Sequence, residues 1–455
     1  MSTRQERYRR GKALRQTTPR SQQGVWKRRR DSVDPVAVIE ASNAGRIPGL
    51  VPLRYARMAQ SPFTFFRGSA ILQAGDLASV AVSGTIVQLC GDCHLMNFGG
   101  FASAERNLIF DINDFDETFP GPWEWDVKRL VTSILLAARS RSFSDAFAKD
   151  AVLAATASYR ERVAEYAAMS PLDVWYTQIG FRDLRSLFRD RTRIAGGLRS
   201  SEAIARRRTS ESLFPKLTTV ENGTARIVDD PPLVYHFGRY EEAWMTAIRE
   251  FLERYRRSMP EDRGKLFDRY CLQDIAVKVV GIGSVGTRCI VALFLADETN
   301  PLFLQAKEAR RSVLEPDGSS RYEHQGLRVV SGQRLMQAAS DIFLGWATSG
   351  QHEYYVRQLR DMKVSPQLEA LRPAAFVAYA RMCGWALARA HAKAGDPATI
   401  AGYVGAGDGF DRAIAKYAVA YADQVESDYV RFERAIHSGR IKAEVGNFTE
   451  AEFAP

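Results

Sequence analysis

The stretch IAVKVVGIGSVGTRCIVALFLADETNPLFLQAKEA, residues 275–309, determines the fold class. Its first β-branched segment runs into three glycines, Gly281, Gly283 and Gly286. The residues after them, 287–296, are again β-branched and aromatic, without the spacing of a helix. A turn and a third apolar segment come next. Consecutive segments of this kind, joined by short glycine- or proline-containing turns, predict a small antiparallel sheet.

The glycine pattern has two known uses, which are distinguished by the element after the last glycine. G-x-G-x-x-G opens a dinucleotide-binding fold when a helix comes next, whereas a second strand is typical of a loop that covers nucleotide phosphates. A lysine at the end of the third strand fits a residue that pairs with those phosphates. A plain hairpin turn and a solvent-facing edge lysine are the simpler alternatives. The predicted nucleotide-binding residues are Gly281, Gly283, Ser284, Gly286 and Lys307, and the acidic partner of the lysine stays open.

A second stretch, VQLCGDCHLMNFGGF at residues 87–101, is compatible with two chemistries. Its C-x-x-C-H, ending at His94, is the attachment signature of a c-type haem. Asp92 and Asn97 in the same stretch have the D-x-x-x-x-N spacing of a phosphotransferase loop. The N-terminus lacks the apolar region of a secretory signal, which argues against haem attachment outside the cytoplasm. We therefore interpret the two cysteines as incidental.

The strand-like segment 106–117 ends in a cluster of acids that suits the second chemistry. A phosphoryl transferase needs a carboxylate to orient or deprotonate the acceptor hydroxyl, and we expect Asp92 to be that catalytic group. Magnesium prefers oxygen ligands, especially carboxylates and phosphates. The expected metal ligands are Asn97, Asp111, Asp114 and Asp116. Whether Asp111 or Asp114 is the main ligand stays open.

The motifs GDCHLMNF, FDINDFDE and WEWDVKRL resemble the aminoglycoside phosphotransferase and choline kinase branch of the protein-kinase-like superfamily. The resemblance implies ATP and Mg²⁺ as cofactors, Asp92 as the catalytic aspartate and Asp114 as the main metal-binding aspartate. It also implies that Asp126 is a structural residue that anchors the catalytic loop. The chain departs from the family pattern at Cys90, where the family has a histidine, and at Asn113, where it has an apolar residue.

From about 55 to 440 the chain resembles the bacterial family called domain of unknown function 2252. The resemblance rests on segments such as SPFTFFRGSA, GDCHLMNFGGF, KVVGIGSVGTRC and GQRLMQAASDIFLGW. It implies no particular substrate.

The order of the motifs is the reverse of that in ordinary kinases, where the glycine loop and lysine come first. A circular permutation accounts for this order, since the termini of a domain often lie close together. We expect an α+β, two-lobed, protein-kinase-like fold with a small antiparallel sheet lobe and a mainly helical lobe. The expected parts are a basic, flexible tail at 1–40, helical lobe at 41–274, nucleotide-binding lobe at 275–362, and helical lobe again at 363–455.

Local patterns fill in this outline. Helices are expected at 124–140, continuing to about 169, and at 239–259, 328–341, 375–394 and 409–437. The aromatic segment at 61–70 has the composition of an extended piece, and residues 196–235 have the composition of a linker.

The charge of the chain is concentrated at one end. Of the net +10, residues 1–30 contribute eleven Lys or Arg against one Glu, so the other 425 of the 455 residues are neutral overall. Such a tail predicts at most non-specific contact with an anionic partner such as nucleic acid. No apolar run reaches membrane-spanning length. The five cysteines are odd in number and sparse, which favours reduced thiols and a cytoplasmic protein.

The expected function is ATP- and Mg²⁺-dependent transfer of a phosphoryl group to a hydroxyl or amine of an unidentified acceptor. AMP transfer on the same fold is the first alternative. A catalytically inactive nucleotide-binding or scaffold protein is the second. The expected partners are a nucleotide and the acceptor, a small molecule or a protein, and no membrane.

Overall fold

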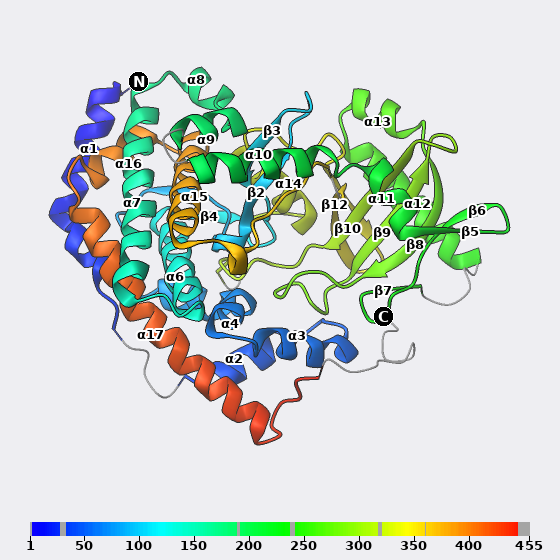
Figure 1. Ribbon diagram of the computed structural model, residues 1–455, viewed down its shortest axis with the longest axis horizontal. Helices are drawn as coiled ribbons and strands as arrows, with labels where there is room; N and C mark the ends of the chain where they lie inside the picture. Colours follow the sequence, from blue (N-terminus) through cyan, green and yellow to red (C-terminus); the bar gives the residue numbers. More distant parts are fainter. Residues whose placement is uncertain are drawn as a thin grey trace.

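The computed structural model describes residues 2–27, 33–188, 192–236, 242–316, 321–359 and 361–444. The fold is mixed α and β, with a six-stranded sheet on one side of the molecule and most of the long helices on the other (Figure 1). This confirms the α+β class. Residues 28–32 of the basic tail lie outside the described residues.

The elements are distributed unevenly along the chain, with most strands in two groups. The helices are α1 (Arg4–Thr17), α2 (Pro35–Ala41), α3 (Val51–Met58), α4 (Pro62–Gly68), α5 (Ala70–Leu77), α6 (Glu124–Ser140), α7 (Asp145–Ala168), α8 (Pro171–Tyr176), α9 (Phe181–Leu187), α10 (Thr192–Arg206), α11 (Ser210–Leu217), α12 (Glu242–Ser258), α13 (Glu261–Phe267), α14 (Gln325–Met336), α15 (Pro373–Ala394), α16 (Pro397–Val404) and α17 (Gly409–His437). The strands are β1 (Ile86–Leu89), β2 (Phe98–Ala102), β3 (Leu108–Ile112), β4 (Phe119–Pro122), β5 (Thr218–Glu221), β6 (Thr224–Ile227), β7 (Val234–Tyr235), β8 (Cys271–Lys278), β9 (Cys289–Leu295), β10 (Pro301–Glu308), β11 (Gly345–Ser349) and β12 (His352–Gln358).

The large sheet has the order β11-β12-β10-β9-β8-β7, and every neighbouring pair in it is antiparallel. The predicted succession of strands after residue 275 is therefore confirmed. The glycine loop joins β8 to β9, and the register places Lys307 of β10 between Cys289 of β9 and Tyr355 of β12. Helix α14 intervenes between β10 and β11.

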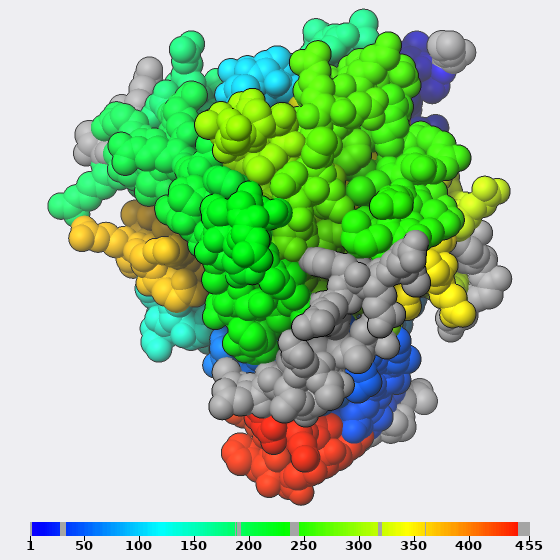
Figure 2. Space-filling model, turned by 90° about the vertical axis from the view of Figure 1, so that its right-hand side faces the viewer, coloured from blue at the N-terminus to red at the C-terminus, as the bar shows by residue number. Residues whose placement is uncertain are grey.

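Both faces of this sheet are covered. On one face, Leu304 and Ala306 of β10 share an apolar core with Tyr255 of α12 and Phe267 of α13. On the other, Phe303 packs in a separate cluster that also contains Leu213 of α11 and two residues of β6, Ala225 and Ile227. Residues of α11, β6, α12 and α13, which precede the expected boundary at 275, therefore pack on the sheet. Figure 2 shows these green segments covering much of the sheet side of the molecule.

The helical side is built around α6, α7, α15 and α17, whose apolar residues form one large core. Trp123, directly before α6, stacks on Tyr159 of α7 with ring centres 5.7 Å apart. α6 carries acids in its first turn, where they complement the positive end of the helix dipole. The four longer predicted helices outside the sheet region, 124–140, its continuation to 169, 375–394 and 409–437, are confirmed within a few residues.

The basic N-terminus differs from the flexible tail that we expected. Residues 4–17 form α1, which starts with a capping box of Thr3 and Glu6 and packs along α16 at the outer edge of the molecule (Figure 1). Arg7 pairs with Asp396 at 2.9 Å. Some of the arginines of the N-terminus therefore hold α1 against the rest of the molecule. The capping box and these ion pairs offset the conformational entropy that would favour a free tail.

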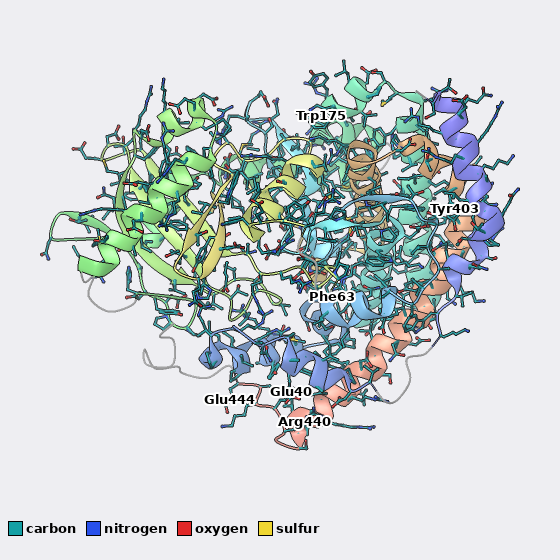
Figure 3. All side chains as sticks on the ribbon, turned by 180° about the vertical axis from the view of Figure 1, so that it is seen from behind. Glu40, Phe63, Trp175, Tyr403, Arg440 and Glu444 are labelled. Carbon is teal, nitrogen blue, oxygen red and sulfur yellow. The ribbon has the colours of Figure 1, made fainter. Side chains whose placement is uncertain are left out.

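Two further local predictions are wrong. Residues 62–68 form α4 instead of an extended piece, because Ser61 and Thr64 make a capping box and Pro62 occupies the first helical turn. The expected linker at 196–235 contains α10, α11 and the β5–β6 hairpin. At the far end of the chain, Arg440 pairs with Asp34 and Glu40 and ties the residues after α17 to α2 (Figure 3).

Candidate functional site

A cavity of about 360 Å³ lies between the helical side and the sheet. The loop between β1 and β2, the acidic residues after β3, the glycine loop and the residues after β10 all line it. Of the predicted site residues, Asp92, Asn97, Asp114, Asp116, Gly281, Gly283 and Ser284 face this cavity. Segments that are far apart in the sequence therefore meet at one place.

Asp126 holds the loop after β1 from behind. Its two carboxylate oxygens accept hydrogen bonds from the backbone N–H groups of Cys90 (2.9 Å) and Gly91 (3.0 Å). His391 of α15 lies 3.3 Å from the same carboxylate. Charge-assisted hydrogen bonds of this kind are among the stronger ones. The geometry of Asp126 therefore matches the anchoring role that was expected of it.

Asp92 presents one carboxylate oxygen to the cavity. Its other oxygen, Oδ1, accepts a hydrogen bond from Arg129 Nε of α6 at 2.8 Å and forms an ion pair with the same guanidinium, 2.7 Å from Nη2. Arg129 is itself buried and stacks over the ring of Phe66 at 3.7 Å. Oδ2 has only the His94 ring nearby, at 3.7 Å, among the described residues. Asp92 is thus oriented by a fixed cation and keeps one oxygen available.

His94 is held neutral beside Asp92. Burial lowers the pKa of His94 to about 3, the nearby Asp92 opposes this shift, and Arg67 and Arg129 add to it. Its Nδ1 atom is buried without a hydrogen-bond partner among the described residues. His94 is therefore an uncharged wall of the cavity at neutral pH.

Asn97 and Asp114 each supply one side-chain oxygen that accepts no hydrogen bond from the described residues. The Asn97 amide nitrogen donates to the backbone oxygen of Asp92 at 2.7 Å, so its Oδ1 is turned the other way and accepts no hydrogen bond from the described residues. Asp114 Oδ1 lies 3.9 Å from the Lys307 ammonium and accepts a hydrogen bond from the backbone N–H of Asp116 at 3.3 Å. Burial acts to raise the pKa of Asp114, but Lys307 and Arg357 outweigh it and the net shift is downward. An ionised carboxylate beside an amide oxygen is a donor set that suits a hard divalent cation.

Lys307 finds its acidic partner in the residues after β3. Its Nζ lies 2.6 Å from Asp116 Oδ2, and the hydroxyl of Tyr355 donates to Asp116 Oδ1, also at 2.6 Å. Burial acts to lower the pKa of Lys307, but Asp114 and Asp116 raise it well above its usual range. α14, which lies between β10 and β11, carries no acid. The acidic partner that the sequence left open is therefore Asp116.

The glycine loop closes over these acids. Ser284 Oγ donates to Asp116 Oδ2 at 3.2 Å. Gly281 has a φ of +69°, a conformation that favours glycine, and its carbonyl accepts a hydrogen bond from Arg57 at 2.6 Å. Gly286 lies behind the loop, where its carbonyl accepts from the Ile47 N–H at 2.7 Å. Segments near the N-terminus therefore hold the loop in place.

Asp111 is placed apart from the cavity that the other three expected metal ligands line. The carboxylate is fully buried, and both of its oxygens lie 2.9 Å from the Arg389 guanidinium of α15. The backbone N–H of Ala338 donates to it as well, at 2.9 Å. A carboxylate satisfied in this way ties β3 to α15, and Asp114 is the acid that faces the cavity.

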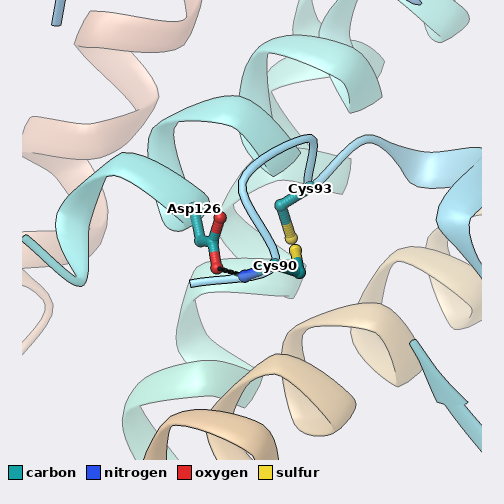
Figure 4. A group of neighbouring side chains, drawn as sticks. All are labelled: Cys90, Cys93 and Asp126. Atoms are coloured by element: carbon teal, nitrogen blue, oxygen red, sulfur yellow. Dashed lines mark hydrogen bonds between the residues drawn. The ribbon is translucent and has the colours of Figure 1, made fainter. Parts of the chain in front are cut away.

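Cys90, Cys93 and Asp126 form a buried group whose ligand atoms lie within 4.8 Å of one another (Figure 4). Burial raises the pKa of Cys90 well above its usual range and that of Cys93 to about 11. A thiol that stays protonated is a poor nucleophile, and the Asp126 oxygens already accept backbone hydrogen bonds. Both cysteines lie in the apolar core of the helical side.

Three residues in or beside the cavity were missed from the sequence. Arg129 lies one helical turn after Asp126, so a search for side chains on the same face of that helix could have found it. Tyr355 lies directly opposite Lys307 in the sheet, a pairing that depends on register. Arg67 comes from α4, a segment expected to be extended, and carries no sequence signal of its own.

A family model described as "Uncharacterized protein conserved in bacteria (DUF2252)" matches residues 46–435. The chain belongs to this family. The match includes all of the cavity-lining segments except Ser42. No curated protein and no solved structure matches the DUF2252 chain. Within the described residues of the DUF2252 chain, no helix is both long enough and apolar enough to span a bilayer.

Proposed function

We propose that the protein is an ATP- and Mg²⁺-dependent phosphotransferase with a circularly permuted, two-lobed, protein-kinase-like fold. One observation carries the proposal. A glycine loop between two antiparallel strands and the Asp92, Asn97 and Asp114 set line one cavity, and a lysine on the next strand, Lys307, lies buried 3.9 Å from Asp114. Each of these parts has a separate task in phosphoryl transfer, and their convergence from distant segments is hard to explain by packing alone.

The permutation is supported by what lies behind the cavity. Helix α15 ends at Ala394, and a Cβ on Gly395 would meet the side chain of Val87 in β1. In an ordinary kinase, a long helix precedes the catalytic loop. Here α15 would be that helix, and its end adjoins β1, the strand that leads into the loop with Asp92. Tyr379 of α15 also donates to the carbonyls of Leu95 and Phe98, at 2.7 and 3.0 Å. The two chain segments that such a permutation would separate therefore lie close together.

The proposed roles are assigned from the free atoms. Asp92 Oδ2 accepts the proton of the acceptor hydroxyl, while Arg129 on Oδ1 fixes the orientation of the carboxylate. Asp114 and the Asn97 amide oxygen would hold Mg²⁺, which neutralises charge on the phosphates when it is bound. Lys307 binds the phosphates as a compact cation after exchanging its ion pair with Asp116. Ser284 and the glycine loop then leave Asp116 and cover the phosphates instead.

The surroundings of Lys307 also suggest where the base of the nucleotide would lie. Gln305 and Phe303 alternate onto the same sheet face as Lys307, and α11 and β6 cover the face around Phe303. The base would therefore not lie against this face of the sheet, and the phosphates would make most of the contacts between the nucleotide and the protein.

Turnover of ATP tests the proposal. Purified protein with MgATP and a panel of hydroxyl and amine compounds is expected to form ADP, and Asp92→Asn is expected to lose this activity. Appearance of AMP on the acceptor together with pyrophosphate would establish the alternative chemistry. Absence of both products, with no nucleotide binding, would refute the proposal and leave the scaffold alternative.

A further inference from the structure

Arg67 is a cation on the wall of the cavity that has no partner among the described residues. It lies in the last turn of α4, and its guanidinium lies 5.7 Å from the ring centre of Phe63. It makes no hydrogen bond or ion pair with any described residue, and its Nε is buried without an acceptor. Burial lowers the pKa of Arg67, while Asp92, Glu369 and Asp114 act in the opposite direction from a distance.

Other arginines that line the cavity are engaged. Arg46 donates to the Val285 carbonyl at 2.6 Å, and Arg54 donates to that of Gly68 at 2.8 Å. Arg310 donates to the Ala44 carbonyl at 2.6 Å. Their guanidinium groups thus have structural tasks, which Arg67 lacks.

An unpaired arginine on the wall of a cavity indicates a binding site for an anion. A largely buried guanidinium is costly unless something neutralises it and accepts its hydrogen bonds. Its planar fork matches a carboxylate or a phosphate with two parallel hydrogen bonds. The cavity wall that carries Arg67 also carries Asp92, the residue proposed to touch the acceptor.

We propose that Arg67 binds an oxyanion of the acceptor, so that the substrate is a hydroxyl or amine compound that also bears a carboxylate or phosphate group. This inference rests on the proposed function. The charge of Asp114 acts on both Lys307 and Arg67: the pKa of Lys307 is raised, whereas burial outweighs this effect at Arg67 and lowers its pKa. The cation on the strand side serves the donor phosphates, and the cation on the helix side is left for the acceptor.

Anion binding with the donor side occupied tests the assignment. The protein is saturated with Mg²⁺ and a non-hydrolysable ATP analogue, and calorimetry measures binding of sulfate, which represents a phosphate group, and of acetate, which represents a carboxylate. At least one of the two is expected to bind, with an affinity that Arg67→Met lowers by about tenfold or more and Arg67→Lys lowers less. Arg310→Met, which removes an engaged arginine from the same cavity, is expected to change it by less than about threefold.

Four results would overturn the assignment. Equal binding in Arg67→Met and Arg310→Met would mean a general effect of charge. Competition between the anion and the ATP analogue would place Arg67 on the donor side. Absence of binding by both anions would remove the site. The ATP analogue itself could fail to bind while the binding of sulfate still depends on Arg67. In that case the proposed function fails and the acceptor assignment fails with it, and Arg67 belongs to an anion site of another chemistry.

Discussion

Asp92 combines a fixed and a free oxygen, and this division governs what its substitution should do. Arg129 holds Oδ1, and Oδ2 faces the cavity. Asparagine keeps the size of the side chain and one carbonyl acceptor for Arg129, but it cannot take a proton. The loop geometry should therefore survive the substitution while proton transfer does not.

We predict that Asp92→Asn lowers turnover about 10²–10⁴-fold, the usual contribution of a general base. Affinity for the nucleotide is expected to change by less than about threefold, since Asp92 does not touch the donor in the proposed mechanism. Steady-state kinetics and calorimetry measure the two quantities. Cys93→Ser, in the same loop but buried away from the cavity, serves as the control and should keep its activity. Loss of activity in the cysteine variant alone would point to thiol chemistry.

His94 predicts a dependence of stability on pH. Its pKa is about 3 in the folded protein and about 6.5 in an unfolded chain. Below pH 6.5 the unfolded state binds a proton at His94 and the folded state does not. The contribution of His94 to the free energy of unfolding is therefore complete above pH 6.5 and falls as the pH is lowered. The slope approaches about 1.4 kcal/mol per pH unit. Urea unfolding of the wild type and of His94→Gln between pH 7.5 and 4.5 should show a shallower decline in the variant. Equal declines of the free energy of unfolding in the wild type and in His94→Gln would contradict this prediction.

Among the elements, α1 and α16 show how closely two helices approach. A Cβ on Gly11 would collide with the Thr399 carbonyl, and one on Gly402 would collide with that of Tyr8. The glycines therefore allow the contact that holds the basic N-terminus against the helical side.

Two glycine substitutions in helices should have opposite effects. Alanine is favoured over glycine inside a helix by up to about 1 kcal/mol. Gly197 of α10 has open space around its Cβ position, so Gly197→Ala should stabilise the protein by that order. Gly11→Ala should instead destabilise it by about 1–3 kcal/mol, because overpacking outweighs the gain in propensity. Chemical denaturation measures both. A stabilising Gly11→Ala would show that α1 does not pack on α16.

Much of the element order was predictable from the sequence, and the failures have physical causes. The helix at 124–140 and the strands after residue 275 carry clear periodicity and turn residues. At 61–70 the aromatic composition suggested an extended piece, but a local capping box decided for a helix. The choice between Asp111 and Asp114 was not available from local sequence, because it depends on Arg389, which lies 278 residues further along the chain. Asp126 was identified by resemblance, and its hydrogen bonds agree.

At the scale of the whole molecule, the covered sheet face predicts weak discrimination between bases. If α11 and β6 keep the base away from the strand that carries Lys307, ATP and GTP should bind with affinities within about threefold of each other. Inorganic tripolyphosphate should then compete with both, because it keeps the phosphates. Competition calorimetry measures this. A preference for ATP of a hundredfold or more would mean that the base enters the sheet face and displaces these elements.

The proposed function depends above all on two distant segments forming one magnesium- and nucleotide-binding site. Calorimetric titration of the full chain with a non-hydrolysable ATP analogue, with Mg²⁺ and with EDTA, measures this most directly. We predict one site per chain, with binding at least about tenfold weaker in EDTA and a Mg²⁺ effect that disappears in Asp114→Asn. Absence of binding at millimolar nucleotide, or binding of the same strength in Mg²⁺ and EDTA, would contradict the proposal.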